Sequence, residues 1–146
     1  MNFIDLRISG QDIDLDEVSK GLNIIPTYSY KQGEERIFKG EKVVYKEDCW
    51  IAQVVVEDEA QTEEKVEEWV DLFYKKKEFF QQLSDKHSVV IWITLYPETE
   101  QCHLHFPKSV IAKLSKLNVD MGITCMQLQD FYSGRYLSMT PRETPV

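Results

Sequence analysis

The chain has 146 residues and a mass of 17.2 kDa, a length that favours one domain with one hydrophobic core. Hydrophobic residues make up 42% of the chain and glycine and proline are few, which excludes a disordered or low-complexity protein. Because 25 acidic residues outnumber 17 basic ones, for a net charge of −8, neither nucleic acid nor an anionic membrane surface is an expected partner.

The N-terminal segment and the cysteines both indicate the compartment. Residues 1–5 carry no basic stretch followed by an apolar run, the pattern of a secretory signal. Cys49, Cys102 and Cys125 stand far apart and fit neither a disulfide framework nor a Cys-x-x-Cys metal site. These features predict a cytoplasmic protein with free thiols.

The first elements are a strand and a short helix. Residues 3–9 alternate apolar and polar side chains, the pattern of a half-buried strand. Asp14 stands three residues before Glu17, a variant of the capping box, and apolar residues then follow at helical spacing. The spacing predicts a helix over 15–22, which must end before Pro26.

The middle of the chain changes from turn-rich to helical. The polar segment 31–48 holds two glycines and short apolar patches, and it predicts a hairpin or an ordered loop. The alternating residues 50–56 predict a strand. From Thr62 the apolar side chains follow a helical stripe that extends to Lys86, with either a kink or a second short helix at 75–77.

The last third is predicted to hold two more strands and a hairpin arm. Residues 89–96 are apolar on both faces, as in a central strand, and 102–106 alternate as the second arm of a hairpin. A helix is expected over 107–117, with proline at its first position, and a final strand from 119 to about 128. Residues 133–146 hold two prolines and few apolar side chains, which predicts a flexible tail.

This order of elements predicts an α+β fold: a mostly antiparallel sheet with about three amphipathic helices packed against it, in a single domain over residues 1–132. The aliphatic residues expected to share its core are Ile4, Leu6, Ile8, Val54, Ile91, Ile93, Leu114 and Ile123.

One stretch of the sequence also resembles a known family. The run from Leu6 to Val18, continued by Leu22, Ile24, Pro26 and Thr27, is similar to the opening of the bacterial domain-of-unknown-function family 4279. Trp50 and residues 116–123 fit as well, so the resemblance covers about residues 4–128. It implies a cytoplasmic, single-domain bacterial α+β protein without an established activity. Thr124 and Met126 stand near positions where family members often carry an Asp and a Tyr.

Motifs for catalysis or cofactor binding are absent from the sequence. It contains neither G-x-x-x-x-G-K-[ST] nor G-x-G-x-x-G, so no nucleotide cofactor is expected. His103 and His105 project from one face of the expected strand, a spacing that metal sites use. With no third ligand nearby, this pair is interpreted as surface histidines, and neither a metal nor another cofactor is predicted.

The most charged segment runs from Glu57 to Asp71 and holds eight acidic residues against one lysine. On the expected helix, these acids lie opposite the apolar stripe. They either solvate the helix or form a binding face, in which Glu64, Glu67 and Glu68 would contact a partner.

Two functions are therefore considered. The first is a non-enzymatic protein-interaction domain, of immunity or accessory type, whose acidic surface contacts a protein with a basic surface. The alternative is a small-molecule-binding domain or minor enzyme with a pocket between sheet and helices, lined by Trp50, Trp92, Tyr96 and His103. A cavity of several hundred cubic ångströms would favour the second function, and a filled core with an exposed apolar patch would favour the first.

Overall fold

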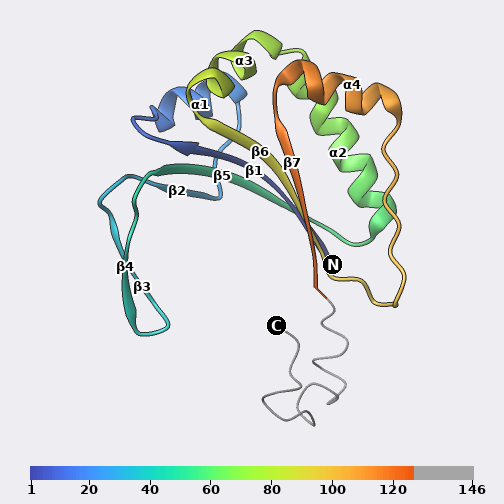
Figure 1. Cartoon of the computed structure of the whole chain (residues 1–146), viewed down its shortest axis with the longest axis horizontal. Coiled ribbons are helices and arrows are strands. Elements are labelled where there is room, and N and C mark those ends of the chain that lie inside the picture. The colour runs from blue at the N-terminus through green and yellow to red at the C-terminus, as the bar shows by residue number, and fades with distance from the viewer. Residues whose placement is uncertain (127–146) are drawn as a thin grey trace.

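The computed structural model describes residues 1–126, which form one five-stranded sheet, a separate two-stranded hairpin and four helices (Figure 1). The strands are β1 (Asn2–Gly10), β2 (Tyr28–Tyr30), β3 (Glu35–Phe38), β4 (Glu41–Val44), β5 (Asp48–Val56), β6 (Ser88–Leu95) and β7 (Asp120–Cys125). The helices are α1 (Leu15–Leu22), α2 (Glu59–Tyr74), α3 (Lys77–Lys86) and α4 (Lys108–Leu117).

The main sheet has the strand order β2-β5-β1-β6-β7. β1 lies at its centre and is antiparallel to both neighbours, so that Leu6 stands opposite Ala52 on β5 and Ile91 on β6. β7 is parallel to β6, because α4 returns the chain to the start of β6. The predicted α+β class with a mostly antiparallel sheet is confirmed.

Short side-chain caps set the helix starts. The Asp14 carboxylate accepts a hydrogen bond from the Glu17 backbone N–H at 3.1 Å, so α1 has the predicted bounds. Asp58 caps α2 in the same way through the Gln61 N–H at 2.8 Å, and α2 therefore begins before Thr62. The expected long helix is two helices, which raises the number from about three to four.

All four helices lie on one side of the sheet, and the core lies between them and the sheet (Figure 1). The strand residues of this core come from alternate positions: Ile4, Leu6, Ile8, Trp50, Ala52, Val56, Val89, Ile91, Ile93 and Leu95. Six of the eight predicted core residues are buried there and Val54 packs partly against it. The prediction for Ile123 was wrong: it is 52% exposed, because β7 is an edge strand.

The predicted strand over 102–106 was also wrong. These residues form no strand, yet their alternation is real, since Cys102, Leu104 and Phe106 pack partly against the core while His103 and His105 are exposed. The segment runs as an extended connection from β6 to α4. The place beside β6 that a hairpin arm would take belongs to β7.

The hairpin predicted over 31–48 is confirmed as β3 and β4. Lys39 and Gly40 connect the two strands, and both have positive φ, the requirement of a two-residue type I′ turn. The hairpin extends from the β2–β5 end of the sheet and away from the helices (Figure 1).

The remaining expectations concern the C-terminal residues and the cysteines. The tail predicted over 133–146 and the end of the last strand near 128 lie outside the described residues. All three cysteines are described, and each is a free thiol. Among residues 1–126, no helix is both long and apolar enough to span a bilayer.

Candidate functional site

The face of the sheet opposite the helices is not covered by any described element (Figure 1). Its centre is a polar cluster on β1 and β5. Asp5 is 3% exposed, and its carboxylate accepts hydrogen bonds from Arg7 Nη2 at 2.7 Å, Arg7 Nε at 3.1 Å and Gln53 Nε2 at 2.8 Å. Arg7 itself keeps an exposed surface on this face. The cluster is therefore a buried anion that holds a guanidinium at the surface.

Trp92 extends this cluster across β6 to β7. The Arg7 guanidinium lies 5.3 Å from the centre of the Trp92 ring, and the indole N–H donates to Thr124 Oγ1 at 2.9 Å. The ring lies over Gly122, where a Cβ atom would stand 2.3 Å from Trp92 Cε3. Only glycine at that position leaves room for the indole, so three strands together position one half-buried tryptophan.

The β3–β4 hairpin continues the exposed surface beyond this face. All eight of its strand residues are exposed. Its large apolar side chains are Ile37 at 77%, Phe38 at 52%, Val43 at 40% and Val44 at 50% exposure. Two of these side chains lie on each face of the hairpin, and exposed apolar patches on soluble proteins often mark interaction sites.

Stacked tyrosines and an arginine attach the hairpin to the sheet. The rings of Tyr30 and Tyr45 are 4.2 Å apart and nearly parallel, and Arg36 Nη1 donates to both hydroxyls, at 3.5 Å and 3.3 Å. Burial and the hydrogen bond with Tyr45 raise the pKa of Tyr30 above its ordinary value. The Tyr30 phenol therefore stays neutral near pH 7 and remains a hydrogen-bond donor and acceptor.

A buried carboxylate fixes the base of the same hairpin. Asp48 is 4% exposed and accepts from the Gln32 N–H at 2.7 Å, the Ile13 N–H at 2.9 Å and Lys31 Nζ at 3.2 Å. The two backbone donors, followed by Lys31, lower the pKa of Asp48 below its usual value. This single side chain joins β5 to the entry of the hairpin and to the loop before α1.

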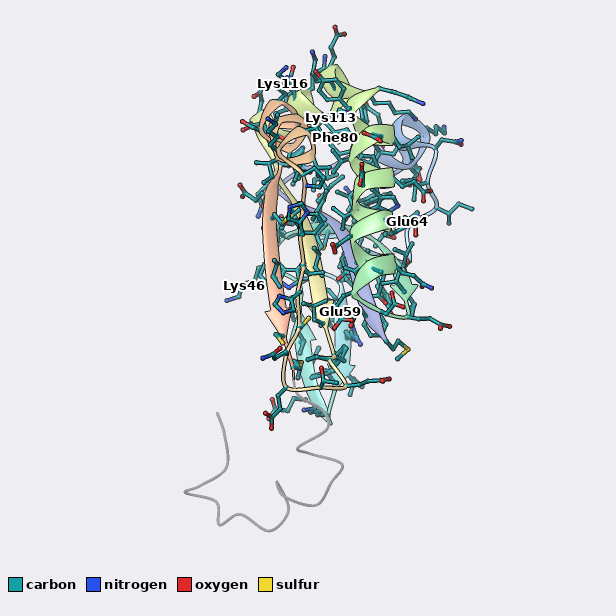
Figure 2. All side chains as sticks on the ribbon, turned by 90° about the vertical axis from the view of Figure 1, so that its right-hand side faces the viewer. Lys46, Glu59, Glu64, Phe80, Lys113 and Lys116 are labelled. Carbon is teal, nitrogen blue, oxygen red and sulfur yellow. The ribbon has the colours of Figure 1, made fainter. Side chains whose placement is uncertain are left out.

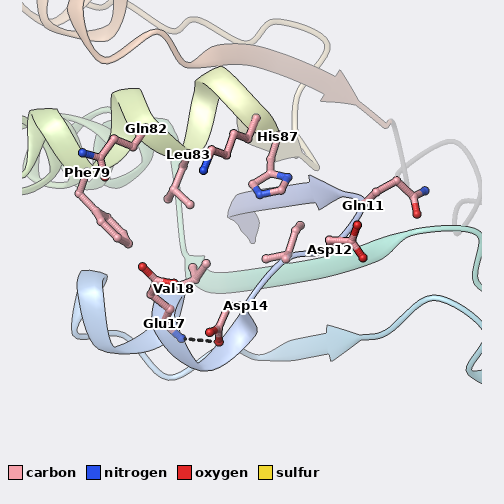
Figure 3. Close-up of a pocket in the computed structure, with 11 residues that line it drawn as sticks. Gln11, Asp12, Asp14, Glu17, Val18, Phe79, Gln82, Leu83 and His87 are labelled. Carbon is pink, nitrogen blue, oxygen red and sulfur yellow. Dashed lines mark hydrogen bonds between the residues drawn. The ribbon is translucent and has the colours of Figure 1, made fainter.

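A surface pocket of about 340 Å³ lies between α1 and α3 (Figure 3). Buried or half-buried apolar side chains form its floor: Ile13, Val18, Phe79 and Leu83. Polar and charged side chains line its walls: Gln11, Asp12, Asp14, Glu17, Gln82, Lys86 and His87. Its volume is at the lower end of the range for small-molecule sites.

Glu64 of α2 lies on the helix side of the molecule, where α4 lies alongside α2 (Figure 2). Glu64, Glu67 and Glu68 are all exposed. Part of this charge is neutralised, because Lys65 pairs with Glu68 at 3.2 Å and Lys113 of α4 pairs with Asp71 at 2.6 Å. The sequence alone did not place that lysine beside the acids.

The family model for a domain of unknown function, DUF4279, matches residues 2–127. The chain belongs to this family. The match extends from β1 to β7 and confirms the resemblance that begins with residues 6–18. No curated protein and no solved structure matches the chain.

In this DUF4279 domain, the four residues predicted to share one pocket are not brought together. Trp50 is fully buried on the helix side and donates to Ser19 Oγ at 2.9 Å, whereas Trp92 lies on the opposite face of the sheet. Tyr96 follows β6 and meets the Phe3 ring edge-on at 5.8 Å. His103 is exposed on the connection to α4. A binding role for each residue separately stays a prediction.

Metal binding and thiol reactivity are the two kinds of chemistry to consider near His103 and His105. Within residues 1–126 of the DUF4279 domain, no group of three or more metal-ligating side chains converges. Burial and a hydrogen bond with Glu59 raise the pKa of the neighbouring Cys102 thiol to about 11. A thiol that stays protonated at neutral pH is a weak nucleophile.

Sequence reasoning missed the polar cluster and the pocket. Asp5 and Arg7 stand in the polar half of the β1 alternation, which only predicts solvent exposure. A signal was present, since alternate residues of a strand share a face and an opposite-charge pair at positions i and i+2 can bond there. The pocket had no local signal, because its walls come from segments about 70 residues apart in the sequence.

Proposed function

We propose that this DUF4279 domain is a non-enzymatic, cytoplasmic protein-interaction domain of immunity or accessory type, which binds its partner on the hairpin and the uncovered face of the sheet. The observation that carries the proposal is the exposed apolar hairpin, which continues from a sheet whose uncovered face presents the half-buried Trp92 and Arg7. Protein interfaces are enriched in such aromatic and arginine anchors. An isolated two-stranded hairpin is only marginally stable in water, so a partner that packs on it would also stabilise it.

The hairpin register provides matched variants. Ile37 and Val44 lie on one face of the hairpin, and Phe38 and Val43 lie on the other. The test compares capture by the wild-type chain, by Ile37→Ser with Val44→Ser, and by Phe38→Ser with Val43→Ser. The control is Leu72→Ser with Ile111→Ser, which removes two exposed apolar side chains from the helix side.

Quantitative mass spectrometry of proteins captured from the native host gives the readout. We expect a protein that the wild type and the control retain and that at least one hairpin variant loses by about 10-fold or more. Purified binding measurements with that protein then follow. If every captured protein is retained equally by all variants, the hairpin is not the interface.

We also propose that Glu64, Glu67 and Glu68 attract a partner with a basic surface. Their exposure and the overall charge of −8 support this idea, and the pairs formed by Lys65 and Lys113 weaken it. Replacing all three with glutamine would slow association and flatten its dependence on salt, since such charges act mainly by long-range steering. Glutamine also has a helix propensity close to that of glutamate.

The matched control for this variant is Glu78→Gln with Asp85→Asn and Asp120→Asn, three exposed acids on other elements. Association rates are measured at low and high salt with the partner found by capture. If both triple variants slow association equally, the acidic face acts only through the net charge of the protein. Identical association rates for the wild type and both variants would contradict the proposal that these acids steer the partner electrostatically.

A second function, small-molecule binding, is favoured by the pocket between α1 and α3. The pocket joins an apolar floor to charged walls, the arrangement that ligand sites commonly have. Its lining differs from the predicted one, since none of Trp50, Trp92, Tyr96 and His103 contributes to it. The ligand titration described in the next subsection tests this function.

A further inference from the structure

The pocket between α1 and α3 presents opposite charges from two sides (Figure 3). Asp12, Asp14 and Glu17 come from α1 and the loop before it. Lys86 and His87 come from the C-terminal end of α3. Asp14 is already engaged as the cap of α1, which leaves Asp12 and Glu17 as the anionic groups of the pocket.

These opposite charges do not pair with one another. In the part of the chain that the structure describes, no ion pair within 4.0 Å includes Asp12, Glu17 or Lys86. All three side chains are exposed. The pocket therefore keeps an anionic wall and a cationic wall apart, with the apolar floor between them.

His87 adds a directed hydrogen-bond donor. Its Nδ1 atom is buried without a hydrogen-bond partner, and the ring packs against Gly10, where a Cβ atom would lie 3.0 Å from Nδ1. Because a buried N–H without an acceptor is unfavourable, the tautomer with its proton on Nε2 is favoured over the one with its proton on Nδ1. His87 thus offers an N–H donor on the same wall as Lys86.

We propose that this pocket binds a small zwitterion with an apolar body, of which a free α-amino acid with an aliphatic or aromatic side chain is the simplest example. The ammonium group of the ligand lies against Glu17, and its carboxylate accepts from Lys86 and His87 Nε2. Its side chain packs on Val18 and Phe79 in the floor. The inference rests on the proposed small-molecule function and specifies its ligand.

The test is a titration of the isotope-labelled full chain, followed by two-dimensional amide NMR. The probes are L-leucine and L-phenylalanine, each with two blocked analogues: the N-acetyl form, which lacks the ammonium charge, and the amide form, which lacks the carboxylate. We expect amide shifts in 10–18 and 79–87 with either amino acid, and binding at least about 10-fold weaker with either analogue.

Single-charge variants test which side chains of the pocket bind the charged groups of the ligand. Glu17→Gln and Lys86→Gln remove one charge from each wall, and we expect each to weaken amino-acid binding by about 10-fold. Glu67→Gln on α2 and Lys116→Gln on α4 make the same chemical changes outside the pocket and are expected to leave binding unchanged. Thermal unfolding of each variant confirms that it is folded.

The outcomes separate this inference from the function on which it rests. If blocked analogues bind as well as the amino acids, the pocket binds small molecules but the zwitterion assignment is wrong. If the shifts occur outside 10–18 and 79–87, the assignment to this pocket is wrong. If neither amino acid nor any analogue produces shifts up to about 10 mM, the proposed ligand class is overturned. If a fragment library also produces no amide shifts in these segments, the proposed small-molecule function is contradicted as well.

Discussion

Two tryptophans on opposite faces of one sheet show how this molecule divides its roles. Trp50 and Trp92 each donate an indole N–H to a hydroxyl at 2.9 Å, to Ser19 and to Thr124. Trp50 is completely buried under the helices, whereas Trp92 is half-buried beneath Arg7. The same side chain with the same kind of hydrogen bond thus belongs to the core on one face and to the partly exposed surface on the other.

Strand β1 shows the same division within a few residues. Ile4, Leu6 and Ile8 are fully buried on the helix side, and the intervening Asp5 and Arg7 form the ion pair of the uncovered face. Each buried aliphatic side chain contributes roughly 1.5–3 kcal/mol through loss of its contact with water. The ion pair adds less net stability, because burying a charge offsets much of the attraction.

The largest expected effect is on the covered face. Ile93→Ala leaves a cavity in the core and is expected to lower the free energy of unfolding by about 2–5 kcal/mol. The matched control is Thr94→Ala, one residue further along β6 on the opposite face, with an expected loss of less than about 1 kcal/mol. Urea unfolding of both variants measures the difference. Equal losses would mean that the two faces contribute alike.

A smaller effect is expected where the hairpin joins the sheet. Asp48→Asn replaces a buried carboxylate that accepts from two backbone N–H groups and Lys31, and should cost about 1.5–3 kcal/mol at pH 7. Amide exchange rates of β3 and β4, measured by NMR, would show whether the hairpin loosens first. Unchanged stability and exchange would show that the hairpin does not need this anchor.

The same variant has a pH signature. Because the folded-state pKa of Asp48 is lowered, its contribution to stability is complete above the unfolded-state pKa of about 3.9. That contribution disappears as pH falls through the lower, folded-state pKa. The difference in unfolding free energy between wild type and Asp48→Asn should therefore shrink on acidification below about pH 4. A difference that grows with acidification would contradict the assignment.

The smallest effect is expected on the uncovered face. Gly122→Ala places a Cβ within 2.3 Å of the Trp92 ring, which must swing away from Thr124 and Arg7. We expect a loss of about 1 kcal/mol and a red-shifted component in tryptophan emission. Trp92→Phe serves as the background that removes this fluorophore, while Trp50 stays buried. A spectrum that does not change would place the indole elsewhere.

Local signals in the sequence predicted the helices well. The Asp14 cap sets the start of α1, and the sequence predicted this start because a cap depends on residues only three positions apart. The prediction for 102–106 failed for the opposite reason. Alternation shows that one side of an extended segment is buried, but a strand also needs a neighbour, and β7 occupies that place beside β6.

The sequence by itself determined most elements of this protein and the two faces of its central strand, because caps, turns and alternation act over a few residues. Only the tertiary structure decided which face the helices cover and which residues meet on the other. Arg7, Trp92 and Thr124 come from three strands, and the walls of the pocket come from α1 and α3. Strand pairing and helix packing join positions far apart along the chain, and no short window of sequence records which distant segments will become neighbours.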